Sequence, residues 1–204
     1  SKESMSDEHL EIRLKLAEVL ETELEDDAGA WFHLSEAWRG RPSDTGLWGD
    51  LLRLSEEQSL WDGLFSVVED VVDALATEDE PWVVTERAAY AFVEEGGRPD
   101  YGIALLERAF EMHPRAHVLE EIERMHRDEE NWEGVLGALE RQLRFHETDG
   151  SALSIRLEQG DLLYRRCDAP EDALVQVVEV LAVTPENQRA RLLGREILES
   201  IGDK

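Results

Sequence analysis

The sequence has 204 residues, 42% hydrophobic and 34% charged, so it can bury a real core while much of its surface stays in water. Forty-eight acidic residues against twenty-one lysines and arginines give a formal net charge of -27, which disfavours nucleic-acid and anionic-lipid partners. A single cysteine, Cys167, excludes an internal disulfide, and no apolar run reaches the roughly 18 to 20 residues that cross a bilayer.

Apolar residues recur at i, i+3, i+4 and i+7, the period of an amphipathic helix and not the alternation of a strand. Glycine, proline and small polar residues mark the main breaks, at residues 40–44, 77–81, 96–100 and 148–151. None of these breaks is typical of a domain linker, so a single domain over residues 1–204 is expected. In chain order the pattern predicts eleven helices, at residues 8–25, 27–39, 45–57, 60–76, 82–95, 99–112, 115–129, 131–147, 151–167, 170–183 and 187–201.

The sequence repeats internally. Pro42, Pro114 and Pro185 lie 72 and 71 residues apart, and each closes the same set of small and large apolar residues. A further small residue stands thirteen residues before each set, at Ala17, Ala89 and Gly160. The three sets are Ala30, Leu34, Ala37; Gly102, Leu106, Ala109; and Ala173, Val177, Val180.

A second unit lies between these copies, so the 71–72-residue period contains two helix pairs. Its members are Leu47, Leu51, Leu54, Trp61 and Gly63 in one copy, and Val118, Ile122, Met125, Trp132 and Gly134 in the other. The two tryptophans begin equivalent second helices and are expected in the core. The glycines are expected to allow close helix approach.

These positions resemble the tetratricopeptide repeat (TPR) family. A TPR unit has a small residue in its first helix and another opening its second, followed by a large apolar, a small and a proline residue four, seven and twelve positions on. The resemblance implies an all-α fold, a right-handed α-solenoid of antiparallel helix pairs. The units are approximately residues 8–42, 45–80, 82–114, 115–149, 151–185 and the half unit 187–204.

The sequence departs from the family pattern in two ways, which predict an irregular superhelix. The small residues are thirteen apart instead of twelve, and the units at Gly63 and Gly134 lack the closing proline. The last segment has the pattern of a first helix without its second. We therefore expect the chain to be part of a longer repeat protein, or its last helix to act as a cap.

Catalytic and metal-binding patterns are weak. His113 and His117 have an i, i+4 spacing, but Pro114 separates them and should end the first helix. Cys167 has Arg165 and Arg166 beside it, yet no base or third group can be named for a nucleophile. We predict no enzymatic activity, no cofactor and no metal site.

The resemblance implies that a partner binds on the concave side, which the first helix of each pair lines. In the family register the outward positions include Trp48, Leu52, Leu119, Glu123 and His126. Trp48 and Leu119 are equivalent by the 71-residue shift, and large apolar anchors in a groove are usual hot spots for a bound peptide. The alternative is that Trp48 packs against Trp38 or an adjoining helix.

Charge is uneven along the chain. Between Leu54 and Glu86 there is no lysine, arginine or histidine, and Glu69, Asp70 and Asp73 are the candidates for contact with a basic partner. The alternative is that these acids solvate outer helix faces. The ten acids of this run are Glu56, Glu57, Asp62, Glu69, Asp70, Asp73, Glu78, Asp79, Glu80 and Glu86.

The sequence therefore predicts a scaffold or adaptor that binds a protein or peptide, with a basic one favoured, and neither nucleic acid nor a membrane interior. One alternative is a structural spacer or self-association module that acts through exposed solenoid ends. Another is an acidic mimic of nucleic acid that captures basic proteins. We expect a cytoplasmic, bacterial protein.

Overall fold

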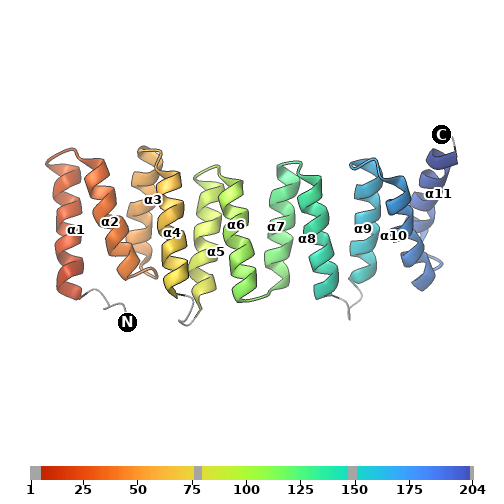
Figure 1. Ribbon diagram of the computed structural model, residues 1–204, viewed down its shortest axis with the longest axis horizontal. Helices are drawn as coiled ribbons and strands as arrows, with labels where there is room; N and C mark the ends of the chain where they lie inside the picture. Colours follow the sequence, from red (N-terminus) through yellow and green to blue (C-terminus); the bar gives the residue numbers. More distant parts are fainter. Residues whose placement is uncertain (1–5, 76–79, 147–150, 203–204) are drawn as a thin grey trace. The chain divides into compact units, whose positions relative to one another are not determined.

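The computed structural model describes residues 6–75, 80–146 and 151–202. Within these ranges the chain has eleven helices and no strand, which confirms the all-α class (Figure 1). The chain divides into two compact units, residues 1–114 and residues 115–204. In each unit consecutive helices lie side by side and run antiparallel, as the repeat predicts. A single domain over residues 1–204 stays a prediction.

The first unit has three helix pairs. They are α1 (Asp7–Thr22) with α2 (Asp27–Gly40), α3 (Thr45–Glu57) with α4 (Trp61–Leu75), and α5 (Pro81–Glu94) with α6 (Pro99–Met112).

The second unit has two pairs and one further helix. They are α7 (Ala116–Asp128) with α8 (Trp132–Phe145), α9 (Ala152–Arg165) with α10 (Pro170–Val183), and α11 (Gln188–Gly202).

Side chains and prolines fix where the helices begin. Asp26, Asp44 and Asn131 each accept a hydrogen bond from a first-turn amide, of Gly29, Gly46 and Gly134 respectively, at 2.9 to 3.1 Å. Pro81, Pro99 and Pro170 occupy the first position of α5, α6 and α10, where the missing N–H removes no helical bond.

A common turn joins the two helices of every pair. One residue has left-handed backbone geometry, with φ between 48° and 58° at Glu25, Ser59, Gly97, Glu130 and Asp168. The amide of the next residue then donates back to a carbonyl of the preceding helix, at 2.8 to 3.0 Å in all five turns. This turn satisfies a carbonyl at the helix end and returns the chain for antiparallel packing.

The turns correct several expected helix ends. The helices predicted over residues 8–25, 115–129 and 151–167 end at Thr22, Asp128 and Arg165. The first prediction includes the left-handed residue Glu25, which must lie outside the helix, and the other two extend to the residue just before one. Residue 76 of the predicted fourth helix and residue 147 of the eighth lie outside the described residues.

The repeat positions form the core, as predicted. All nine residues of the three sets are buried, from Ala30, Leu34 and Ala37 in α2 to Val177 and Val180 in α10. In the first unit Trp38 lies against Trp48, with ring centroids 4.9 Å apart. The stacked pair Phe65 and Tyr101, with centroids 4.0 Å apart, joins α4 to α6.

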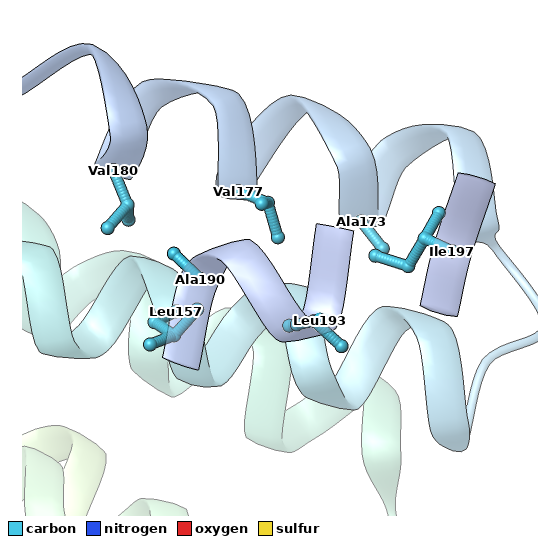
Figure 2. Close-up of a cluster of buried hydrophobic side chains, with 7 residues drawn as sticks. All are labelled: Leu157, Ala173, Val177, Val180, Ala190, Leu193 and Ile197. Atoms are coloured by element: carbon cyan, nitrogen blue, oxygen red, sulfur yellow. The ribbon is translucent and has the colours of Figure 1, made fainter. Parts of the chain in front are cut away.

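A compact cluster holds α9, α10 and α11 together in the second unit (Figure 2). Leu157, Val177, Leu193 and Ile197 point toward one another from these three helices. Gly194 lies so close to α10 that a Cβ there would stand 3.1 Å from a Val177 methyl group.

Close approach also explains Gly134, as the sequence suggests. A Cβ at this position would stand 2.5 to 2.6 Å from carbons of the His126 ring. Trp61 and Trp132, expected in the core, are half-buried. Trp61 lies edge-on to Phe92, and Trp132 packs on a core cluster of α8 and α9 with Arg166 over its ring.

The turn geometry predicts that Glu130→Gly raises the free energy of unfolding by about 0.5 to 1 kcal/mol, because glycine adopts positive φ without the strain of a Cβ. Urea unfolding followed by circular dichroism measures the change. The neighbouring Glu129→Gly is the matched control, since Glu129 has φ -84° and gains nothing from glycine. Equal effects of the two substitutions would contradict the assignment.

The cluster in Figure 2 predicts that Ile197→Ala lowers the free energy of unfolding by about 2 to 4 kcal/mol through the cavity it leaves. The adjacent Leu198→Ala is the control and should change it by less than about 0.5 kcal/mol, since Leu198 is 56% exposed and Ile197 fully buried. Chemical denaturation of both variants tests the difference.

Candidate protein-binding site

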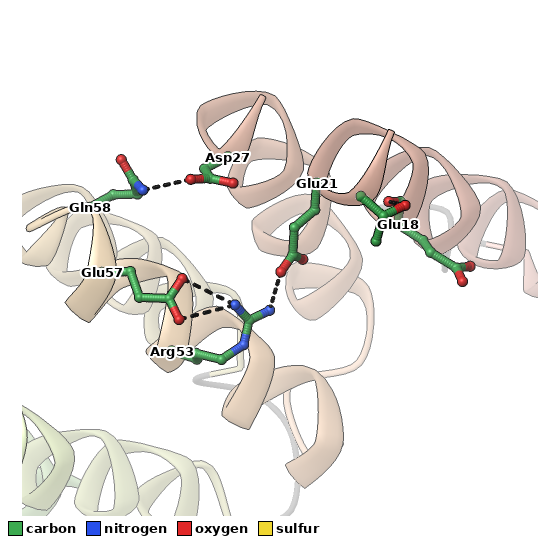
Figure 3. A network of polar contacts seen from close by, with 7 residues as sticks. Glu18, Glu21, Asp27, Arg53, Glu57 and Gln58 are labelled. Carbon is green, nitrogen blue, oxygen red and sulfur yellow. Dashed lines mark hydrogen bonds and ion pairs between the residues drawn. The ribbon is translucent and has the colours of Figure 1, made fainter. Parts of the chain in front are cut away.

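The first helices of neighbouring pairs are joined by arginines, each of which binds one acid on its own helix and one on an adjacent first helix. In the first unit Arg53 of α3 donates to Glu21 of α1 at 2.7 Å and to Glu57 at 3.2 Å (Figure 3). We call these groups the arginine triads. The other two, in the second unit, are Arg127 with Glu123 and Glu158, and Arg165 with Asp161 and Glu196.

The triads keep their arginines charged. Partial burial acts to lower the pKa of Arg53, but hydrogen bonds from its guanidinium to Glu21 and Glu57 outweigh burial and raise the pKa. The Glu123 carboxylate raises the pKa of Arg127, and the Asp161 and Glu196 carboxylates raise that of Arg165. Since all these side chains are partly exposed, the ion pairs add little stability and mainly fix side-chain positions.

The triad of Arg53 borders a cleft of about 470 Å³ that opens between α1 and α3. Four acids and one base line this cleft, which we call the acidic cleft. Arg53 is bound to Glu21, and Asp44 caps α3 through the amides of Gly46 and Leu47. The remaining two acids are Glu18 and Asp50.

Glu18 and Asp50 differ from the other acids of the cleft. Both are exposed, and within the described ranges neither carboxylate has a hydrogen bond or ion pair. Glu18 lies on α1 three residues before Glu21, on the helix that Figure 3 shows facing Arg53. The cleft therefore offers two carboxylates that a cationic side chain of a partner can bind without displacing an internal arginine.

The predicted apolar anchors do not have the expected outward orientation. Trp48 is 5% exposed and lies against Trp38, the alternative that the sequence left open, and Leu52 and Leu119 are also buried. Buried and half-buried residues make up most of the circumference of α3 and of α7, so each helix exposes only a narrow strip to solvent. That these three residues contribute to partner binding stays a prediction. Because they are buried, their contribution would be to hold the helices in place.

Glu123 and His126 lie on α7 in half-buried positions. Glu123 belongs to a triad and also accepts a hydrogen bond from Gln142 of α8 at 3.0 Å. His126 pairs with the Asn131 amide at 3.2 Å and covers Gly134. Both therefore hold α7 against α8, and binding of a partner by either stays a prediction.

The acidic run is not a uniform free patch. Asp70 accepts from Arg39 of α2 at 2.6 Å, and Asp73 pairs with Arg108 of α6. Asp62 accepts from Arg98 and Tyr101, and these hydrogen bonds lower its pKa. Within the described residues Glu69 has no ion pair. Glu78 and Asp79 lie outside the described residues.

No further chemistry appears in the parts of the chain that the structure describes. There, no group of three histidine, cysteine or acidic side chains is placed to hold a metal ion. His113 caps α6 and stacks on Trp82, while Cys167 is half-buried in the turn after α9. None of the helices described combines the length and the apolar character needed to cross a bilayer.

Comparisons with known proteins find similarity at the level of solved structures. No family model and no curated protein matches the chain. The chain is similar to TTC0263, a thermophilic TPR protein of Thermus thermophilus, with 17% identity over 93% of this chain and 98% of that one, at a TM-score of 0.39. It is also similar to YrrB, described as a TPR protein with an unusual peptide-binding site, with 13% identity over 90% of each chain and a TM-score of 0.40.

A third similar structure is the complex of the TPR2AB domain of yeast Sti1 with pHSP90. It shares 11% identity over 97% of this chain and 86% of that chain, with a TM-score of 0.37. All three are TPR proteins, the class that the sequence pattern resembles. Because these TM-scores and identities are low, the fold is assigned from the chain's own helix pairs.

Proposed function

We propose that this chain is a protein-binding scaffold whose acidic cleft receives lysine or arginine side chains of a basic partner segment. The observation that supports it best is a pair of carboxylates, Glu18 and Asp50, which have no partner among the residues that the structure describes and lie on two different helices that line one cleft. Other acids of the first helices are already bound by the triad arginines, namely Glu21, Glu57, Glu123, Glu158, Asp161 and Glu196.

Long-range charge favours the same class of partner. A net charge of -27 attracts cations from all directions, while the unpartnered carboxylates would choose the place of contact. Exposed charges interact over about 10 Å at 0.1 M salt, so binding should be fast and salt-sensitive. A cytoplasmic location and a single domain over residues 1–204 belong to the same proposal, supported by the lone Cys167 and the continuous repeat.

The cleft predicts that Glu18→Gln with Asp50→Asn weakens binding of a fluorescent peptide with six lysines spaced by alanines by about fivefold to tenfold, because two charge contacts are lost. Fluorescence anisotropy at about 0.05 M and 0.3 M salt measures the affinity, which should fall with salt. The control is Glu111→Gln with Glu120→Gln, which removes the same charge from exposed acids outside the cleft. Equal loss in both variants would show diffuse attraction and no site.

A second candidate function, self-association, is favoured by one observation on α1. Ile12, Leu16 and Val19 form an apolar stripe on this helix, and each is between 43% and 48% exposed. Shifted by 72 residues they become Val84, Ala88 and Ala91 of α5, which are buried. The same repeat positions are thus covered by neighbouring helices inside the chain and uncovered on α1.

If the stripe binds a second copy of the chain, the sedimentation coefficient should rise with concentration and stay at the monomer value when Ile12, Leu16 and Val19 are replaced by glutamine. Val175→Gln with Val178→Gln is the control, since both valines are more than half exposed on α10. A monomer at all concentrations would exclude this second function and leave the scaffold proposal untouched.

A further inference from the structure

A second cleft lies in the other unit, among α8, α9 and α10, with a volume of about 1180 Å³. Its apolar lining comes from all three helices: Leu136 and Leu143 of α8, Leu153 and Leu163 of α9, and Val183 of α10. We call it the apolar cleft. It involves the side of α9 that carries Gln159, whereas the triad residues Glu158, Asp161 and Arg165 lie outside its lining.

Gln159 is the unusual residue of this lining. It is 7% exposed, yet its side-chain amide has no hydrogen bond within the part of the chain that the structure describes. At the equivalent position, 71 residues earlier, α5 has Ala88, which is buried without any polar group. The nitrogen and oxygen of this amide keep contact with the solvent in the cleft, so the amide can bind a molecule there without giving up an internal hydrogen bond.

Gln142 provides a contrast in the same unit. It is also buried, but its amide donates to the Leu119 carbonyl at 3.3 Å and to Glu123 at 3.0 Å, so it holds α8 to α7. Gln159 has no such structural bond. Its amide keeps both a donor and an acceptor for a molecule in the cleft.

Gly137 leaves the α8 wall of the cleft open. A Cβ added at this glycine would meet no atom within 4 Å, although the residue lies in the middle of a helix. Alanine would favour the helix, so the glycine is not explained by local stability or by close packing. Its effect is to leave room in the cleft.

Both arginines that line the cleft already have acidic partners. Arg156 donates to Gln176 at 3.2 Å and pairs with Glu179, and Arg144 pairs with Glu140 at 3.7 Å. Selection in this cleft therefore depends on apolar surface and on the Gln159 amide. That combination differs from the acidic cleft of the first unit.

We propose that the apolar cleft binds an extended peptide segment of a partner protein, with an apolar side chain among the leucines and a main-chain amide group paired with Gln159. An extended strand keeps its N–H and C=O groups free, whereas a helix has already used them, so the donor and acceptor of one glutamine match an extended chain. The lining of α8 from Glu133 to Arg144 spans about 16 Å, the length of about five extended residues.

The test begins with selection of binders from a displayed library of random twelve-residue peptides against the 204-residue chain. Affinities of the enriched peptides are then measured by calorimetry for the native chain and for Gln159→Met, which keeps the size and removes the amide. We expect about tenfold weaker binding. The unfolding temperature should stay close to that of the native chain, because Gln159 has no internal hydrogen bond to lose among the described residues.

A second variant keeps the test decisive if Gln159→Met folds poorly. Gly137→Phe places a ring in the cleft where the chain has no atoms, and it should abolish binding of the same peptides. The control is Gly49→Phe on α3, where a Cβ also meets nothing within 4 Å. It should bind them like the native chain.

The proposal is overturned if no enriched peptide loses affinity in either Gln159→Met or Gly137→Phe. It is also overturned if the enriched peptides are basic and lose affinity only in the Glu18 and Asp50 variant. That second result would support the acidic cleft as a binding site and exclude the apolar cleft, so the experiment tests the two sites independently.

Discussion

The left-handed turn between the helices of each pair is the constraint on which the rest of this structure depends. One residue at positive φ, followed by an amide that bonds back to the helix, reverses the chain within a few residues at Glu25, Ser59, Gly97, Glu130 and Asp168. The closing hydrogen bond spans six residues in the turns after α1, α5 and α9 and five residues in the turns after α3 and α7, so each kind of helix pair keeps its own register and the two kinds alternate along the chain. The clefts follow from it, since the strip of each helix left uncovered is set by that register.

The sequence was informative about packing and much less so about these turns. Ala30, Leu34 and Ala37 recur with their counterparts because helix crossings require a particular sequence of side-chain sizes, and that requirement is visible in residue types. A left-handed residue is recognised from sequence when it is glycine, and only Gly97 is. Glu25, Ser59, Glu130 and Asp168 accept the strain, so three helices were expected to run through or up to their turns.

The same holds for the candidate site: the residue types predict which helix each residue lies on, whereas its contacts are known only from the structure. The repeat register places Trp48 and Leu119 on defined helices, but it does not give the width of the buried stripe, and α3 is buried on two flanks. The acidic run is plain in the sequence, whereas the arginines that bind it come from Arg39 and Arg108 outside the run. Glu18 and Asp50 lie on separate helices, so no local pattern joins them.

Unused bonding capacity, and not composition, is the basis on which we propose binding surfaces in this chain. An acid bound to an arginine, such as Asp70, must exchange an existing ion pair for a new one, and the net gain for a partner is small. An acid such as Asp50, or a buried amide such as that of Gln159, has nothing to give up. The same reasoning separates Gln142 from Gln159, two buried glutamines in one unit, because only the first already has its partners. The two proposed clefts differ in chemistry, lie one in each unit and share no lining residue, so binding at one can be tested without the other.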